Sequence, residues 1–209
     1  MIEAIALIFV GWLLGLFGTI IIDAIRKRYQ KEDIRTAIIS ELKEIQYRLA
    51  CSVYLLNRRF GTINKQLLSW TSQILKSYSG AYSDGLVLEA LERQLKLSDE
   101  QLESLEEIMK PDKSKAITLR KYTTPFLDFR IGSLSMFPPS YQLKLFEIKS
   151  QLGLLNDRIE DSKFYYRMTF EPNISTENYD TMCYELEQCY KDIADKSKTI
   201  ADSISSCFH

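Results

Sequence analysis

Residues 4–22 read AIALIFVGWLLGLFGTIII, nineteen consecutive positions without a charged side chain, of which twelve are Leu, Ile, Phe or Val. As an α-helix, this stretch would be roughly 28 Å long, close to the thickness of the hydrocarbon core of a bilayer. At about −0.4 kcal/mol per apolar residue, transfer of the twelve residues into a membrane is favoured by about 5 kcal/mol. We therefore expect one N-terminal transmembrane helix, and we assign residues 1–25 to a membrane anchor.

The charges on either side of this stretch predict its orientation. Residues 1–3 contain no Lys or Arg, whereas the juxtamembrane segment 26–33 is rich in both. Because basic flanks stay in the cytoplasm, the N-terminus should lie outside the cell and the rest of the chain inside it, below the inner membrane. The basic residues expected to contact lipid headgroups are Arg26, Lys27, Arg28 and Lys31.

A cleaved signal peptide is the competing interpretation of the same stretch. Such a peptide has a basic start, a shorter apolar core and a cleavage site of small residues. Here the start carries Glu3, and the end of the stretch, Ile20-Ile21-Ile22-Asp23, has no small-residue site. The sequence therefore favours an anchor that stays attached.

Residues 34–209 are expected to form one helical soluble domain. The chain carries 27 Lys and Arg against 28 Asp and Glu, so it lacks the basic excess typical of nucleic-acid-binding proteins. In a reducing cytoplasm its four cysteines should be free thiols, and their spacing is not that of a metal site. These cysteines are Cys51, Cys183, Cys189 and Cys207.

Apolar residues recur every three or four positions between residues 34 and 56, which predicts an amphipathic helix. No Pro or Gly lies between Gly18 and Gly61, so this helix can continue directly from the membrane span. Further helices are predicted over residues 63–75 and 86–96, and another begins at Ser98, where Gln101 would complete a capping box. Pro125 indicates a kink or the start of a new helix.

Two long apolar stripes, over residues 141–166 and 179–207, predict the last two helices. Glu171-Pro172-Asn173 separates them, and Ser175 or Thr176 should cap the second helix. Their alternating three- and four-residue steps resemble a coiled coil, so the helices should pack as an antiparallel hairpin. No alternating strand pattern is present. The expected fold is all-α, with a transmembrane helix, a cytoplasmic bundle and this C-terminal hairpin.

The residues that catalysis or metal binding commonly requires are scarce. The only histidine is His209, the last residue, where a scaffold cannot hold an imidazole in place. Glu147 and Lys149 follow Asp112 in an order that imitates a metal nuclease, but two residues apart on a helix they face different directions. No glycine-rich phosphate loop is present. We therefore assign no catalytic, cofactor-binding or metal-binding residue and expect no cofactor; any small-molecule ligand stays unknown.

Two other features point to partners. Gly11, Gly15 and Thr19 lie four residues apart on one face of the span, a spacing that lets two membrane helices approach closely. Aromatic residues gather between positions 126 and 170, where we expect a packed core rather than a stacking pocket. Because three consecutive rings at positions 164–166 cannot face one core, at least one should be exposed.

Together these patterns predict a non-enzymatic, membrane-tethered helical module that recruits a protein partner or forms a homo-oligomer. The alternative is a membrane-tethered effector enzyme or toxin, for example in bacterial defence, whose catalytic carboxylates the sequence does not distinguish from surface charges. A third interpretation is a subunit of a larger membrane complex.

Overall fold

A computed structural model describes residues 2–80, 85–108 and 117–208 of the chain. Within these residues every regular element is a helix, so the predicted all-α class is confirmed. The helices are α1 (Ile2–Phe60), α2 (Lys65–Ser77), α3 (Gly85–Leu95), α4 (Asp99–Ile108), α5 (Pro125–Phe129), the 3-10 helix η1 (Ile131–Met136), α6 (Pro139–Met168) and α7 (Thr176–Ser206).

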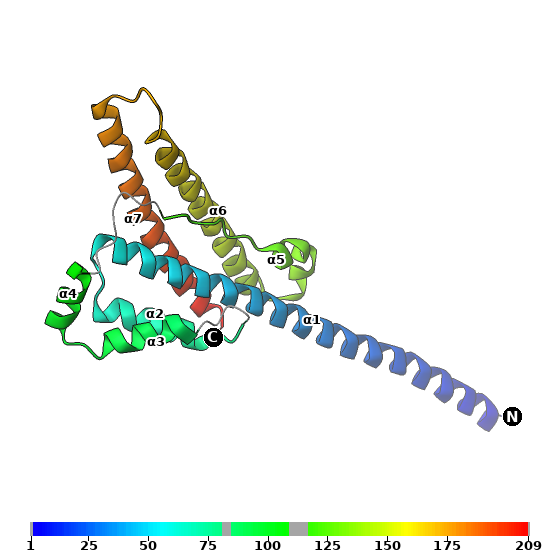
Figure 1. Cartoon of the computed structure of the whole chain (residues 1–209). Helices are drawn as coiled ribbons and strands as arrows, with labels where there is room; N and C mark the ends of the chain where they lie inside the picture. The colour runs from blue at the N-terminus through cyan, green and yellow to red at the C-terminus, as the bar shows by residue number, and fades with distance from the viewer. Residues whose placement is uncertain (1, 81–84, 109–116, 209) are drawn as a thin grey trace.

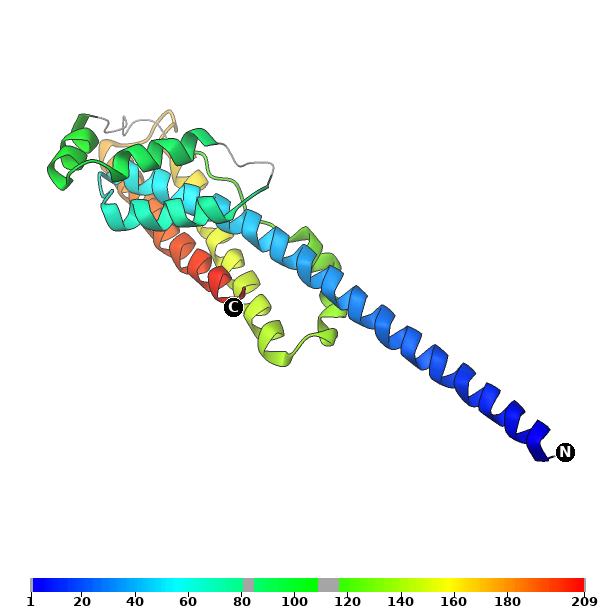
Figure 2. The ribbon, with the colours of Figure 1, turned by 90° about the horizontal axis from the view of Figure 1, so that it is seen from below.

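Helix α1 is one uninterrupted helix of 59 residues, as the absence of breaking residues predicted. It ends before Gly61, whose φ of 64° places it in the left-handed region that glycine adopts without strain. The C-terminal half of α1 packs into the body of the protein, whereas the N-terminal half projects from it as a bare rod (Figures 1 and 2). This division follows the sequence, because Ile34 is the first buried residue among the described side chains of α1.

The core lies between α1, α6 and α7, and α7 packs against both of the other helices. All seven predicted core residues of α1 are buried: Ile34, Ile38, Leu42, Ile45, Leu49, Val53 and Leu56. Polar contacts fix the register of the helices. The Gln46 side-chain amide donates to the Ala201 carbonyl at 2.7 Å, and the Arg158 guanidinium pairs with Asp192 at 2.7 Å.

Helices α6 and α7 form the predicted antiparallel hairpin (Figure 1). The hydroxyl of Ser175 caps α7 by accepting the backbone N–H of Asn178. One part of the α7 stripe differs from the prediction: Tyr179 is exposed rather than buried. The first turns of α7 extend beyond the end of α1, so no third helix covers them.

Helices α2, α3 and α4 form a second layer, in which α2 packs against both α1 and α3. The cap of α4 was predicted from the sequence, whereas the cap of α2 was not. Asn64 accepts the backbone N–H of Leu67 at 2.9 Å and begins α2. Ser98 and Gln101 exchange hydrogen bonds with each other's backbone N–H groups, which confirms the capping box.

On the other side of α1, an irregular segment leads into α5, which begins at Pro125 as predicted. Asn156 of α6 holds this segment, since its side chain bonds both the N–H and the C=O of Tyr122 at 2.8 Å. Glu41 of α1 accepts the backbone N–H groups of Phe126 and Leu127. Helix α5 is therefore fastened to α1 by its first turn.

Considering the described residues alone, no helix is long and apolar enough to cross a membrane. The predicted span falls on residues 4–22, and the side chains at positions 4–8, 10, 13, 14 and 16 lie outside the described part of the structure.

Candidate functional site

The projecting half of α1 exposes large apolar side chains on all sides. Those described are between 50% and 61% exposed: Phe9, Trp12, Phe17, Ile20, Ile21, Ile22 and Ile25. Monomeric soluble proteins rarely leave so large a continuous apolar surface in water. The described apolar side chains of this half of α1 are therefore not covered by the described rest of the chain.

The predicted association face, Gly11, Gly15 and Thr19, lies on this projecting rod and is exposed. A Cβ atom added at Gly11 or Gly15 would meet no atom within 4 Å. These glycines are therefore not required by packing within one chain, and the space beside them is open to a second helix.

The predicted headgroup-contacting residues lie where α1 leaves the body. Arg26, Lys27 and Arg28 are exposed, while Lys31 is half-buried. The ammonium group of Lys31 lies 5.7 Å from the centre of the Phe137 ring, a cation–π contact with the segment just before α6. The structure thus brings the basic segment of α1 next to residues more than 100 positions away in the sequence.

A second apolar surface lies at the end of the α6–α7 hairpin, which we call the hairpin-end surface. Phe164, Phe170, Tyr179 and Tyr184 are each between 44% and 67% exposed. As predicted for residues 164–166, not all three rings are buried: Phe164 is exposed, while Tyr165 and Tyr166 pack against the core. The expected aromatic core is therefore wrong for Phe164 and Phe170, because no described helix covers this end of the hairpin. It is also wrong for Phe129 and Phe146, which are exposed elsewhere on the body.

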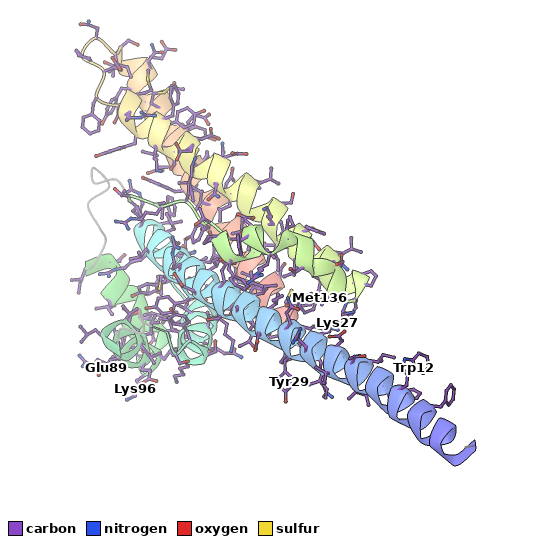
Figure 3. All side chains as sticks on the ribbon, turned by 90° about the vertical axis from the view of Figure 1, so that its right-hand side faces the viewer. Trp12, Lys27, Tyr29, Glu89, Lys96 and Met136 are labelled. Atoms are coloured by element: carbon purple, nitrogen blue, oxygen red, sulfur yellow. The ribbon has the colours of Figure 1, made fainter. Side chains whose placement is uncertain are left out.

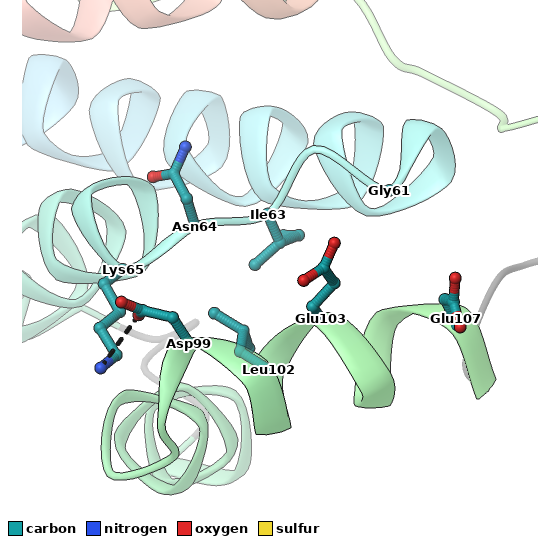
Figure 4. A pocket seen from close by; sticks show the side chains of 8 residues that line it. All are labelled: Gly61, Ile63, Asn64, Lys65, Asp99, Leu102, Glu103 and Glu107. Carbon is teal, nitrogen blue, oxygen red and sulfur yellow. Dashed lines mark ion pairs between the residues drawn. The ribbon is translucent and has the colours of Figure 1, made fainter.

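A pocket of about 350 Å³ lies between the turn after α1 and helix α4 (Figure 4). Its charged lining is mainly acidic, with Asp99, Glu103 and Glu107 on α4. Lys65 pairs with Asp99 at 3.1 Å. The described residues include no group of three His, Cys, Asp or Glu side chains that could hold a metal ion. The residues that line the pocket include no Ser, Thr, Cys or His that a neighbouring base could activate as a nucleophile.

The remaining reactive groups are placed for packing. Burial raises the pKa of the Cys189 and Cys207 thiols, which keeps them protonated and unreactive at neutral pH. Lys149 pairs with Asp128, an exposed contact between α6 and the end of α5. His209 and Asp112 lie outside the described residues.

One exposed apolar surface was not predicted from the sequence. Phe129 is 78% exposed and Ile131 is 47% exposed, on the segment that joins α5 to η1. The sequence gives no distinctive signal for this surface. Residues 129–146 contain no Asp or Glu, but neither does the longer stretch 45–83, which includes buried parts of α1 and α2.

Comparison of the chain with protein-family models, curated proteins and solved structures returns no significant match. The function must therefore be argued from the described surfaces.

Proposed function

We propose that this protein is a single-pass, membrane-anchored helical module that presents its C-terminal hairpin to a protein partner. The observation that carries the proposal is the bare, apolar N-terminal half of α1. Its apolar stretch, residues 4–22, has the length of a membrane span, and its described side chains are exposed. Lipid would cover the surface that the chain leaves uncovered.

The orientation proposed is N-terminus outside and helical body in the cytoplasm of a bacterial-type inner membrane. Arg26, Lys27 and Arg28 support it, because they are exposed directly after the apolar stretch and the opposite flank has no basic residue. Since α1 is one uninterrupted helix, the body would be held rigidly relative to the bilayer.

The hairpin-end surface is the proposed docking site for a protein partner. It points away from the N-terminal end of α1 and so would face the cytosol (Figure 1). Exposed Phe and Tyr side chains are typical of protein interfaces, where they bury large areas at low entropic cost. Its surroundings carry charges of both signs, such as Arg167 and Glu177, which fits a protein surface better than a nucleic acid.

The anchor is tested by extracting membranes from cells that make the full chain. Carbonate at high pH should leave the protein in the membrane pellet, and only detergent should release it. In whole cells, external protease should leave the body intact, whereas in inverted vesicles it should digest the body. Release by carbonate, or digestion of the body from outside, would overturn the anchor or its orientation respectively.

The docking site is tested by crosslinking in membranes and comparing variants. Phe170→Ala with Tyr184→Ala should abolish the crosslinked species that the unmodified chain forms. Ile108→Ala, which removes an 83%-exposed side chain at the end of α4, should leave these species unchanged. If both variants behave alike, the hairpin end is not the docking site. If the crosslinked species contains only this chain, the surface joins two copies and the proposed partner is wrong.

A further inference from the structure

A pocket of about 300 Å³ lies where the last turns of α6 meet α7 and the irregular segment before α5. We call it the hairpin pocket. Tyr190 of α7 and the neighbouring residues Ile117 and Thr118 line it, together with residues of α6 between positions 160 and 167. Figure 3 shows the end of the hairpin and Trp12 of the bare rod at opposite ends of the molecule, so the pocket lies far from the proposed membrane span.

Hydrogen bonds hold the walls of the hairpin pocket in place. The Tyr190 hydroxyl accepts the backbone N–H of Ile117 at 3.1 Å and donates to the Ile117 carbonyl at 3.2 Å. The side chain of Tyr190 is fully buried behind this contact. Because the walls are fixed, the pocket does not have to be ordered when a ligand binds, which lowers the entropic cost of binding.

The charged groups of the hairpin pocket leave one cation for a ligand. Glu160 is the only acidic residue among the described residues of the lining, and it pairs with Lys163 at 2.8 Å and with Lys121 at 3.6 Å. Arg167 donates one hydrogen bond, from Nε to the Lys163 carbonyl at 3.4 Å, and forms no ion pair with a described residue. The two terminal nitrogens of its guanidinium are therefore available.

The other groups of the lining indicate a carboxylate rather than a phosphate. The hydroxyls of Thr118 and Tyr166 form no hydrogen bond with the described residues, so they add two donors beside the guanidinium. A guanidinium matches the planar carboxylate group, which accepts two parallel hydrogen bonds. Phosphorylated peptides are typically recognised by clusters of Arg, whereas this lining has one Arg and apolar walls.

The hairpin pocket adjoins the hairpin-end surface. The rings of Tyr166 and Phe170 pack edge to face, with their centres 5.0 Å apart. Tyr166 lines the pocket and Phe170 belongs to the hairpin-end surface, so one bound segment can cover both.

We propose that the hairpin pocket receives a carboxylate of the docked protein partner, held by Arg167, while an apolar side chain of the same partner segment packs on Phe170. This inference rests on the proposed function and names the chemistry of the partner. The partner presents a peptide segment in which an Asp, a Glu or a C-terminal carboxylate lies beside a large apolar residue.

The first test measures docking in membranes that contain the full chain, with the photocrosslinker benzoylphenylalanine in place of Tyr179. Arg167→Glu should lower the yield of the crosslinked partner by about tenfold or more, because it brings two negative charges together. Arg167→Lys keeps the positive charge and should lower the yield by less than about threefold. The matched control is Lys196→Glu, a charge reversal at an exposed position of α7 about 9 Å along the helix from Tyr190, and it should leave the yield unchanged.

Circular dichroism checks that Arg167→Glu keeps the helix content of the unmodified chain. An unchanged yield in Arg167→Glu, with crosslinking lost in the Phe170→Ala, Tyr184→Ala variant, would overturn the carboxylate pocket while the docking site stands. Equal losses in Arg167→Glu and Lys196→Glu would also overturn it, because the effect would then come from overall charge. Absence of a crosslinked partner in every variant would overturn the docking site itself.

The second test identifies the group that residue 167 contacts. In the Arg167→Lys chain, a carbodiimide joins the new amine to a carboxylate in contact with it, and mass spectrometry of the digested product identifies the linked peptide. We expect an Asp, a Glu or a C-terminal residue of another protein, next to an apolar residue. Coupling to a small-molecule acid, or only to carboxylates of this chain, would overturn the inference.

Discussion

One carboxylate oxygen of Glu41 lies 2.7 Å from the backbone nitrogen of Phe126, and its other oxygen accepts the next backbone N–H. A five-residue helix has too few internal hydrogen bonds to be stable by itself, so this side chain of α1 acts as its cap. The position of α5 thus depends on one residue in the middle of α1.

Replacing Glu41 should therefore loosen the attachment of α5 to α1 without unfolding the body. We expect Glu41→Ala to lower the free energy of unfolding by about 1–3 kcal/mol, because it leaves two partly buried N–H groups without an acceptor. Urea unfolding of the detergent-solubilised chain, followed by helical circular dichroism, measures the change. Glu32→Ala, at an exposed position on the same helix, is the control and should change stability by less than about 0.5 kcal/mol. Equal effects of the two substitutions would show that the cap contributes nothing.

Asn156 has a similar role in the segment before α5. Its side chain forms hydrogen bonds with both the backbone N–H and the backbone C=O of Tyr122. Among the described residues, no strand lies beside this segment to pair with these two groups. Asn156→Ala should cost about 1–3 kcal/mol and should increase hydrogen exchange at the Tyr122 amide. Asp157→Ala, at the exposed adjacent position, serves as the comparison. If amide exchange at Tyr122 is the same in both variants, the bridge does not hold this segment.

The limits of sequence reasoning are visible at these two side chains. Periodicity predicts the buried face of α1, because apolar spacing directly encodes which side meets a neighbour. It also predicts the hairpin, whose two stripes match in length. It does not predict that Glu41 meets Phe126 or that Asn156 meets Tyr122, since these contacts join polar residues 85 and 34 positions apart with no repeating pattern. For the same reason the exposed side chains of Phe129 and Ile131 were not predicted as a surface.

The body should lose stability in alkaline solution. Burial raises the pKa of the Cys189, Cys207 and Tyr190 side chains in the folded state. The unfolded chain releases these protons near the ordinary values, about 8.5 for Cys and about 10 for Tyr. Above about pH 8.5 the unfolded state therefore binds fewer protons than the folded state, so the free energy of unfolding falls as pH rises.

Urea midpoints between about pH 7 and about pH 10.5 measure this effect. Tyr190→Phe should lower stability at pH 7, because the hydroxyl bonds the backbone of Ile117 at 3.1 and 3.2 Å. The same substitution should flatten the decline above pH 9.5, because one of the titrating groups is gone. A decline equally steep in both proteins would exclude Tyr190 as a source of the alkaline sensitivity.

The glycine face of α1 offers a separate test of self-association. Gly11→Leu with Gly15→Leu should disrupt close packing of two spans by adding bulk where the helices would approach, and should reduce any oligomer in mild detergent to a monomer. Because a Cβ atom added at either glycine meets no neighbouring atom within 4 Å, the substitution should leave helix content and stability unchanged. Phe17→Leu is the control. At about 100° per residue, position 17 lies about 240° around the helix from Gly11, so it is on a different face. Sedimentation velocity gives the oligomer size, and an unchanged size in the double variant would mean that this face does not join two copies.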